Sequence, residues 1–317
     1  FYTKAIHFQR RKFFSQVLDV KNFIETMNIN VINTHSSKDS WIALPAARVA
    51  RNRPLAIRTR HLSTPIGKNI LTQLLYMHLP HAVITTGESI KKQMVDINLF
   101  NPDKIVSIPT GVDTAFFNPD KPYKDIRDEL NMPHSTPLVG SLSVLRSWKG
   151  LDYFVKAVPL ILQKFPDVRF IIVGDGPYKA KLEEAIQITG ESEKIYLLGH
   201  REDVVDILSS LDILVHPSYA NEGVPQTILQ AMSMKKPVIA TSLESQAEIV
   251  LPGKTGIVIP TKNSESLATE VVMLLRNKNL AKELGENARR LVETSYSFEG
   301  MIEKIELLYK ELFNKRE

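Results

Sequence analysis

The chain has 317 residues, of which 43% are hydrophobic and 24% are charged, and it contains no cysteine. A chain of this length favours two domains, because domains mostly run to about 100–200 residues. The lack of cysteine excludes disulfides and thiolate metal sites. No apolar run approaches the roughly 18 residues that would span a bilayer, so we expect any membrane contact to be peripheral.

The net charge of +5 is divided unevenly along the chain. Residues 1–110 hold 15 Lys and Arg against 6 Asp and Glu, or +9, and the remaining residues sum to −4. Five arginines stand close together in "RVARNRPLAIRTRH", residues 48–61. This half of the chain is therefore expected to meet an anionic partner. A solvated basic face is the alternative interpretation.

In the first third of the chain, short β-type runs alternate with helical patterns. Each run ends in small or polar residues, and the runs lie at 31–37, 55–61, 82–87 and 105–111. Such alternation predicts a parallel sheet built from βαβ units, in which ligands bind at the carboxyl ends of the strands. We interpret the irregular, Pro-rich stretch 112–137 as a linker between domains.

The alternation restarts after this linker. Apolar runs recur at 137–144, 168–176, 194–200, 211–218, 236–242 and 255–260. The tail over residues 265–313 has apolar residues at helical spacing and predicts two or three amphipathic helices. The sequence thus predicts an α/β protein with a first domain over 1–111, a second over 138–297, and a helix over 298–317 that packs back toward the first domain.

The segment "FIIVGDGP" ends a buried strand with two closely spaced glycines, Gly174 and Gly176. Lys179 stands where a dinucleotide fingerprint would place its third glycine, and the next strand does not end in an acidic residue. A nicotinamide-dependent oxidoreductase is therefore poorly supported. These glycines, and Gly140 at a predicted turn, still allow a ligand to approach the backbone closely.

Two cations follow in "GSLSVLRSWKG". Arg146 and Lys149 stand just ahead of a helix that is expected to begin near Gly150. Cations beside a helix N-terminus suit a diphosphate, because a guanidinium grips phosphate oxygens bidentately and an ammonium adds a point charge. Two surface cations in a loop are the alternative interpretation.

The segment "NEGVPQTILQ" combines an acid with a predicted helix start. Pro225 suits the first turn of a helix, since its φ is already helical and its missing N–H is not needed. Glu222 would then lie at the helix entrance, and Gln230 would fall on the same helix face as Gln226. The N–H groups expected to point toward an anionic or polar ligand are those of Gly223, Val224 and Gln226. The alternative is an acid that stabilises the helix dipole and an ordinary helical glutamine.

The order of these motifs resembles that of the retaining glycosyltransferases of family 4, which have the GT-B fold. The second half carries the resemblance through "VGSLSVLRSWKGLDYFVKA", "FIIVGDGP", "NEGVPQTILQAMSMKKPVIAT" and "AEIVLPGKTGIVIP". The first half carries it through "NTHSS", "RTRHLS", "AVITTGESIKKQM" and "IPTGVDTAFF". Within that family, the chain is similar to bacterial enzymes that build lipopolysaccharide core or other cell-envelope glycans.

The resemblance implies two Rossmann-like domains that face a cleft, and an enzyme that moves a sugar from a nucleotide-diphosphate donor to an acceptor hydroxyl with retention of configuration. It implies no metal and no other cofactor. The implied partners are the nucleotide sugar, an anionic glycolipid or glycan acceptor and an anionic membrane surface, with no nucleic acid. We accordingly expect a cytoplasmic protein that is peripheral at the inner face of the cytoplasmic membrane.

The resemblance also assigns roles to single residues. Arg146 and Lys149 match the cations that hold the donor diphosphate and stabilise the leaving group. Glu222 matches the first acid of an acid-x7-acid motif, which contacts the donor sugar, and Gln230 takes the place of the second acid, which holds the ribose. His61 matches a histidine near the anomeric carbon, although a structural role stays open for this residue. The other implied donor-site residues are Gly140, Gly174, Gly176, His200, Arg201, Gly223, Val224, Pro225 and Gln226.

Two departures from the family pattern stand out. The family often has an arginine where this chain has Ser141. The family's first strand and glycine-rich acceptor loop are absent at the front, and at about 30 residues per βαβ unit we expect roughly 40–60 residues to be missing. Since the first strand is central in such sheets, a gap in the first sheet is expected. Two rival functions stay open, a GT-B sugar-nucleotide epimerase and a catalytically silent nucleotide-sugar-binding protein.

Overall fold

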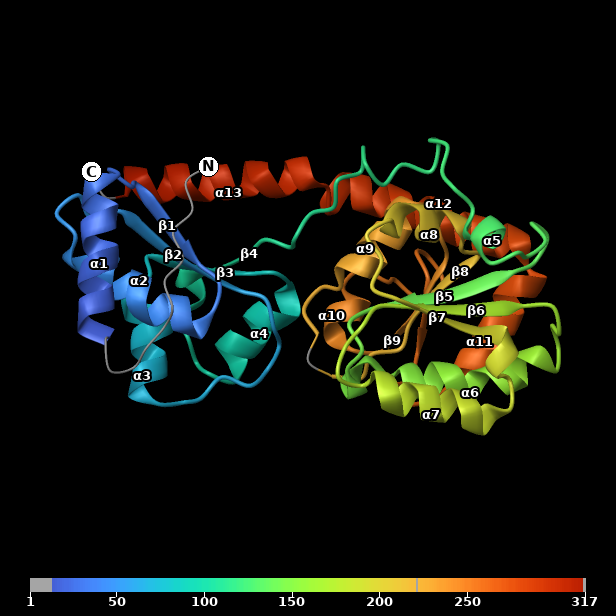
Figure 1. Cartoon of the computed structure of the whole chain (residues 1–317). Helices are drawn as coiled ribbons and strands as arrows, with labels where there is room; N and C mark the ends of the chain where they lie inside the picture. The colour runs from blue at the N-terminus through green and yellow to red at the C-terminus, as the bar shows by residue number, and fades with distance from the viewer. Residues whose placement is uncertain (1–12, 221, 316–317) are drawn as a thin grey trace. The chain divides into compact units, whose positions relative to one another are not determined.

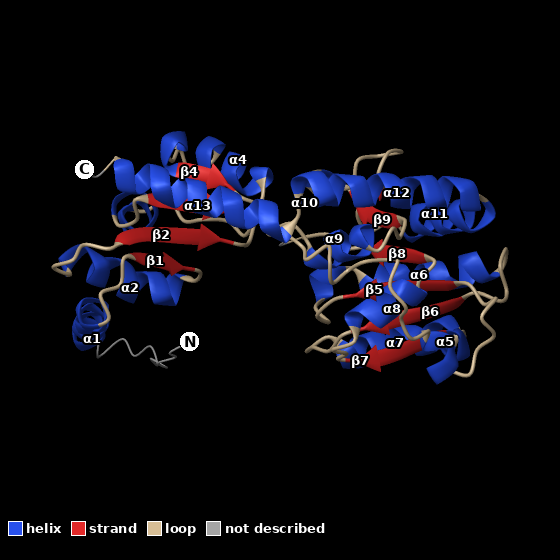
Figure 2. Cartoon of the chain, turned by 90° about the horizontal axis from the view of Figure 1, so that it is seen from above, coloured by secondary structure: helices blue, strands red, loops and turns tan. Residues whose placement is uncertain are grey.

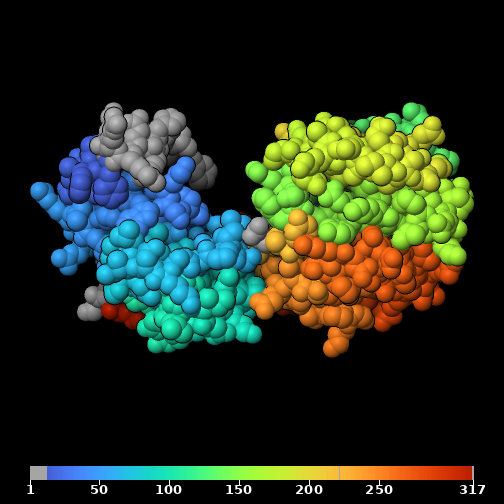
Figure 3. Space-filling view, turned by 90° about the horizontal axis from the view of Figure 1, so that it is seen from below, coloured from blue at the N-terminus to red at the C-terminus, as the bar shows by residue number. Residues whose placement is uncertain are grey.

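A computed structural model describes residues 13–220 and 222–315 of the chain. The chain divides into two units, one made of Phe1–Pro109 with Met301–Glu317 and the other of Thr110–Gly300. In Figure 3 the first unit carries the blue to teal residues together with a red patch from the end of the chain. Each unit is a parallel α/β fold, as the alternation of apolar runs and helical patterns predicts.

The first unit is built on a parallel sheet in the order β1-β2-β3-β4 (Figure 1). Its described strands are β1 (Val31–Thr34), β2 (Leu55–Arg60), β3 (Ala82–Thr85) and β4 (Ile105–Ser107). All of them fall inside the predicted apolar runs. Because β1 lies at one edge and the described strands pair without interruption, the expected gap in this sheet is wrong. Consecutive strands on one side of a central strand pair with one another directly, so the loss of the central strand leaves no gap between them.

Helices cover both faces of this sheet. On one face Leu44, Ala56 and Tyr76 belong to one cluster of buried side chains, and on the other Leu308 of the last helix packs on Ile57. Figure 2 shows that last helix lying along the sheet. The helical elements of the first unit are α1 (Phe13–Thr26), α2 (Ser37–Val49), α3 (Ile70–Gln73), the π-helix η2 (Leu74–His78), α4 (Glu88–Asp96), the 3₁₀ turn η3 (Pro102–Lys104) and α13 (Phe298–Asn314), which enters this unit at Met301.

The second unit is built on a parallel sheet in the order β10-β9-β8-β5-β6-β7. Its strands are β5 (Leu138–Leu142), β6 (Arg169–Val173), β7 (Ile195–Gly199), β8 (Ile213–His216), β9 (Val238–Thr241) and β10 (Ile257–Ile259). Each falls inside a predicted run. Leu138 and Val139 belong to two separate buried clusters, one on each face of the sheet. Burial on both faces explains why these strands appear in the sequence as continuous apolar runs.

The helices of the second unit lie on both sides of its sheet (Figure 1). They are α5 (Ile126–Glu129), α6 (Leu151–Leu162), α7 (Lys179–Thr189), α8 (Val204–Ser210), α9 (Gln226–Ser233), α10 (Glu244–Ala247), α11 (Ser264–Arg276) and α12 (Lys278–Ser295), with 3₁₀ turns η4 (Ser147–Lys149) and η5 (Ser192–Lys194). In residues 13–220 and 222–315, no helix combines the length and the apolar character needed to cross a membrane.

The predicted linker, residues 112–137, lies within the second unit. Val112 forms a backbone bridge to Ser297, and Ile126 of α5 is buried in the core of that unit. The Arg127 guanidinium bonds the Asp212 carboxylate at 2.8 Å. These contacts correct the prediction of a linker between domains. The stretch is rich in Pro and polar residues, but one short helix and a buried arginine anchor it to the second unit.

Candidate functional site

The strand order of the second unit creates a switch point between β5 and β8. From β5 the chain runs to β6 and β7 on one side, and it then crosses to β8 on the other side. In open α/β sheets, ligands bind outside the carboxyl ends of the strands at such a point, where the connections leave in opposite directions. The predicted residues Arg146, Lys149 and Glu222 lie in the segments that follow β5 and β8.

The segment after β5 is fixed to the segment after β6 by backbone contacts. The Leu145 N–H donates to the Asp175 carbonyl at 2.9 Å. Gly174 and Gly176 have φ values of 133° and 156°, and a Cβ on either would collide with the carbonyl group of Ser143 or Leu145. Both glycines therefore permit one loop to pack on another, and a close approach of a ligand at these positions stays a prediction.

Gly140 also serves packing. It lies inside β5, where a Cβ would stand 2.5 Å from Leu211 Cδ2 and 3.1 Å from Ile171 Cγ1. The prediction of a ligand-facing turn at Gly140 is therefore wrong, because the strand continues to Leu142 and neighbouring side chains cover the glycine.

Backbone contacts also join the segment after β5 to the segment after β8. Gly150 adopts a φ of 69° between η4 and α6, and a Cβ there would collide with the Pro217 carbonyl. The Tyr219 N–H donates to the Trp148 carbonyl at 2.9 Å. These contacts place Lys149 beside the residues that follow β8.

Lys149 and Glu222 form a buried ion pair across this junction. Lys149 Nζ lies 2.6 Å from Glu222 Oε1, and the two side chains are only 14% and 8% exposed. His216 Nε2 lies 3.8 Å from the same oxygen. Burial of the carboxylate acts to raise the pKa of Glu222, but His216 and Lys149 outweigh this effect and lower the pKa to about 2. Glu222 is therefore ionised at neutral pH.

His216 is a member of this site that the sequence analysis did not single out. Its Nε2 lies 3.2 Å from Ser218 Oγ, and its Nδ1 is buried without a hydrogen-bond partner among the described residues. The hydroxyls of Ser141 and Ser143, at the end of β5, are also buried and lack a partner within the same residues. The available signal was a histidine that ends a predicted strand in "LDILVHPS", shortly before Glu222.

The backbone before α9 offers free donors. Pro225 occupies the N-cap with φ −73° and ψ 120°, so it precedes the first turn, whereas the sequence predicted it within that turn. No acceptor is found in the described part of the chain for the N–H groups of Gly223, Val224 and Gln226. The Gln226 side chain is itself engaged, since its Nε2 donates to the Thr110 carbonyl at 3.2 Å. A helix N-terminus with free N–H groups favours an anionic group.

Arg146 does not join the buried pair. Its side chain is exposed, and its Cζ lies 5.6 Å from the ring centroid of Trp148. Lys149 is thus the largely covered cation of this site and Arg146 an exposed one. Gln230 is half-buried in α9, one turn after Gln226.

Arg201 has a structural partner. Its guanidinium bonds both carboxylate oxygens of Glu129 at 2.6 and 2.8 Å and both oxygens of Asp203 at 2.9 and 2.7 Å. The side chain therefore fixes α5 to the segment after β7. A role for backbone groups at His200 and Arg201 in nucleotide binding stays a prediction.

His61 lies in the first unit, just after β2. Its Nε2 is 2.9 Å from His35 Nδ1, and the two rings stack with centroids 5.2 Å apart. Burial and the neighbouring His35 lower the pKa of His61. His35 and His61, which follow β1 and β2, are therefore brought together, and a neutral His61 is favoured at pH 7.

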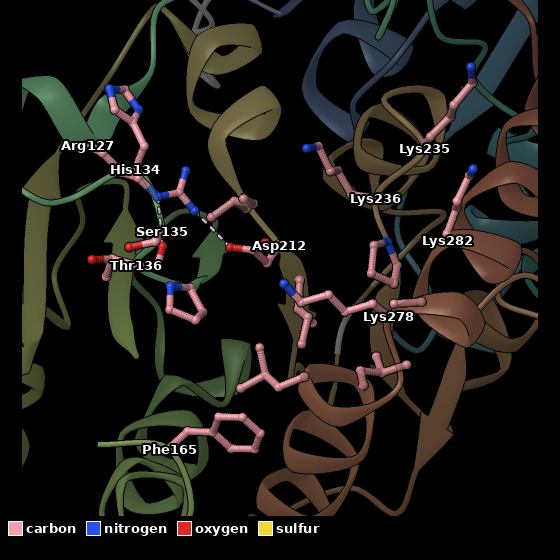
Figure 4. A pocket seen from close by; sticks show the side chains of 17 residues that line it. Arg127, His134, Ser135, Thr136, Phe165, Asp212, Lys235, Lys236, Lys278 and Lys282 are labelled. Atoms are coloured by element: carbon pink, nitrogen blue, oxygen red, sulfur yellow. Dashed lines mark hydrogen bonds and ion pairs between the residues drawn. The ribbon is translucent and has the colours of Figure 1, made fainter. Parts of the chain in front are cut away.

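A separate basic cavity of about 540 Å³ lies at the opposite ends of the strands of the second sheet (Figure 4). It is lined by Pro137, Asp212 and Pro237, which precede β5, β8 and β9, and by Lys278 and Lys282. It therefore lies at the amino ends of the strands, away from the switch-point site.

Comparisons with known proteins give one family model for each half of the chain. The family model described as Glycosyl transferases group 1 matches residues 122–291, and the model described as Glycosyltransferase Family 4 matches residues 4–116. A solved structure of a glycosyltransferase from Rickettsia africae superposes with a TM-score of 0.87 at 22% identity, over 99% of this chain and 84% of that one.

Two curated relatives resemble this chain in sequence. An alpha-D-kanosaminyltransferase of Streptomyces kanamyceticus is 28% identical over 56% of this chain and 46% of its own length. The UDP-Gal:alpha-D-GlcNAc-diphosphoundecaprenol alpha-1,3-galactosyltransferase of Escherichia coli is 27% identical over 93% of this chain and 80% of its own length. The match to the Streptomyces relative thus spans less than half of that protein.

Proposed function

The chain belongs to the family of group 1 glycosyl transferases, and we propose that the protein moves a sugar from a nucleotide-diphosphate donor to a hydroxyl group of an acceptor. The observation that carries this proposal is the buried pair of Lys149 and Glu222 at the switch point between β5 and β8. The site combines a cation, an ionised acid and the free N–H groups before α9, and this combination suits a sugar diphosphate. Phosphate oxygens accept hydrogen bonds from cations and N–H groups, and sugar hydroxyls donate to carboxylates.

Each of these groups has a role in the proposed donor complex. The Lys149 ammonium has three N–H donors and gives one to Glu222, so two are available to the diphosphate. Arg146 adds a guanidinium that can bind phosphate oxygens bidentately. Glu222 accepts hydrogen bonds from the donor sugar, and Gln230 holds the ribose hydroxyls in place of a second acid.

We infer that transfer retains the anomeric configuration. The bond between the anomeric carbon and the diphosphate oxygen breaks, and its electrons pass to the diphosphate. The acceptor oxygen bonds the anomeric carbon on the same face, and its proton passes to the leaving diphosphate. Lys149 and Arg146 stabilise the charge that develops on the leaving group.

The acceptor we propose is an anionic glycolipid or a cell-envelope glycan. The E. coli relative is named for a lipid diphosphate acceptor. The charge of +9 over residues 1–110 favours such a partner, because a basic surface attracts anions and anionic lipid surfaces.

The test is a transfer assay with UDP-, GDP- and ADP-sugars and a polyprenyl-diphosphate sugar as acceptor. We expect one donor to release nucleoside diphosphate and glycosylated lipid in equal amounts, and proton NMR to show a retained configuration. Lys149→Ala should lower turnover by about 10²–10³-fold, the usual effect of removing one preorganised charge contact. Lys164→Ala, an exposed lysine of the same unit, is the control.

The rival functions give different results in this assay. Epimerisation or hydrolysis of the nucleotide sugar without an acceptor would identify an epimerase. Donor binding without any product would identify a silent binding protein.

A further inference from the structure

Two arginines of β2 point to one face of the first sheet. Arg58 and Arg60 are two residues apart, and alternate side chains of a strand lie on the same face. Arg58 is buried, with 3% of its surface exposed, and Arg60 is half-buried. In the described part of the chain neither forms an ion pair with a carboxylate. This is unusual, because buried charges in proteins are normally paired.

Tyr76 lies between the two guanidinium groups. Its hydroxyl accepts a hydrogen bond from Arg58 Nη2 at 3.0 Å and another from Arg60 Nη1 at 2.9 Å. Arg58 Cζ also lies 4.1 Å from the centre of the Tyr76 ring. Tyr76 belongs to the π-helix η2, a rare element that frequently marks functional sites. The two cations are therefore held within two hydrogen-bond lengths of each other.

Arg60 Nη2 donates to the carbonyl and hydroxyl oxygens of Thr64, which leaves three guanidinium nitrogens without a partner. Arg58 Nε, Arg58 Nη1 and Arg60 Nε are buried and find no acceptor among the described residues. Arg127, a buried arginine of the second unit, differs, since its nitrogens bond the Thr136 and Ser210 carbonyls and the Asp212 carboxylate. The comparison indicates that Arg58 and Arg60 lack an anionic partner.

A cavity of about 450 Å³ lies next to these arginines. Arg60, Thr64 and Trp41 line it, together with Ser37 and Tyr76. The hydroxyls of Ser37 and Tyr76 both bond Arg58 Nη2, at 3.4 and 3.0 Å, so the Arg58 guanidinium lies directly behind the cavity wall. An anion in the cavity can therefore contact Arg60 directly, and the charge of Arg58 acts on it from behind the Ser37 and Tyr76 hydroxyls.

We propose that this cavity binds the phosphate or diphosphate group of the acceptor, an inference that rests on the transferase function proposed above. Guanidinium groups match the geometry of phosphate oxygens and bind them bidentately. Two adjacent guanidinium groups balance the charge of a phosphomonoester or diphosphate better than that of a single carboxylate. The hydroxyls of Ser37 and Thr64 can donate further hydrogen bonds to the phosphate oxygens.

The two tryptophans of the chain allow a test that separates this site from the donor site. Trp41 lines the cavity, and Trp148 lies beside Lys149. In a Trp148→Phe variant, pyrophosphate titration should give a saturable change in Trp41 fluorescence. Arg60→Gln should weaken this binding at least tenfold, whereas Arg51→Gln, an exposed arginine before β2, should leave it within twofold.

The source of the phosphate is tested with phosphatidylcholine vesicles that contain phosphatidic acid. A Trp41 response to these vesicles that Arg60→Gln abolishes assigns the group to a lipid, and a response to pyrophosphate alone assigns it to a soluble acceptor. No saturable response to either probe, or equal affinity in Arg60→Gln, would overturn the proposal. The donor site is tested separately in a Trp41→Phe variant. If Trp148 fluorescence does not respond to UDP there, the proposed donor site fails, whatever the result at the cavity beside Arg60.

Discussion

Replacing Lys149 by Met would leave the Glu222 carboxylate buried without its nearest cation. The pKa of Glu222 is about 2 against an ordinary 4.5, and at about 1.4 kcal/mol per unit its surroundings favour the ionised form by roughly 3 kcal/mol. Removing one partner of a buried pair typically costs about 3–5 kcal/mol, because the other charge is left unpaired. Lys149 shares the stabilisation with His216, so we expect the free energy of unfolding of the second unit to fall by about 3 kcal/mol.

The assay is urea unfolding at pH 7 in a Trp41→Phe background, where Trp148 is the sole tryptophan and reports on the second unit. Adding Glu222→Gln to Lys149→Met should recover about 1 kcal/mol or more, since the unpaired charge is then removed. Lys164→Met should stay within about 0.5 kcal/mol of the parent. A midpoint for Lys149→Met equal to that of the parent, or strictly additive effects in the double variant, would refute this reasoning.

Three further predictions follow from the same region. Because the folded-state pKa of Glu222 lies below its ordinary value, the contribution of this carboxylate to stability is complete above about pH 4.5 and is lost as the pH falls toward 2. The difference in thermal midpoint between wild type and Glu222→Gln should therefore shrink between pH 5 and 3, and a constant difference would contradict this. Gly174→Ala should cost more stability in urea unfolding than Gly190→Ala, because both have positive φ but only Gly174 faces a backbone carbonyl; equal midpoints would contradict the packing role. Gln230→Leu should weaken UDP-sugar binding in calorimetry by about 1–3 kcal/mol through an unpaired ribose hydroxyl, and Gln230→Glu should stay within about tenfold of wild type; unchanged affinity in the leucine variant would assign Gln230 to the helix alone.

Much of the fold could be predicted from local sequence. Every described strand falls inside a predicted apolar run, because strands of a parallel sheet are buried on both faces and are apolar throughout. Helical spacing alone predicted two or three helices in the tail, and the structure has three there, α11, α12 and α13. These features depend on patterns within about 20 residues of sequence, where periodicity is most informative.

The features that the sequence did not predict are contacts between segments far apart in the chain. The packing role of Gly174 depends on the carbonyl of Ser143, and the assignment of residues 112–137 to the second unit depends on partners such as Asp212. The ion pair of Lys149 and Glu222 joins residues 73 positions apart. Composition and periodicity do not encode such pairings, and the resemblance to a family placed both residues in one site without indicating that they bond each other.

For a related reason, the sequence alone could not show that the charge of Arg58 is unpaired. The basic stretch around it was consistent with either a solvated face or an anion site. Only its burial beside Tyr76, with two guanidinium nitrogens left without acceptors in the described part of the chain, separates these interpretations.

The central claim is that the switch-point site of the second unit binds a nucleoside diphosphate through Lys149. The most direct measurement is an equilibrium titration of UDP, GDP and ADP into the Trp41→Phe variant, followed by the fluorescence of Trp148. We predict a saturable response to at least one of the three, weakened at least tenfold by Lys149→Ala and unchanged by Lys164→Ala. No response to any of them at millimolar concentration, or equal binding in Lys149→Ala, would contradict the account.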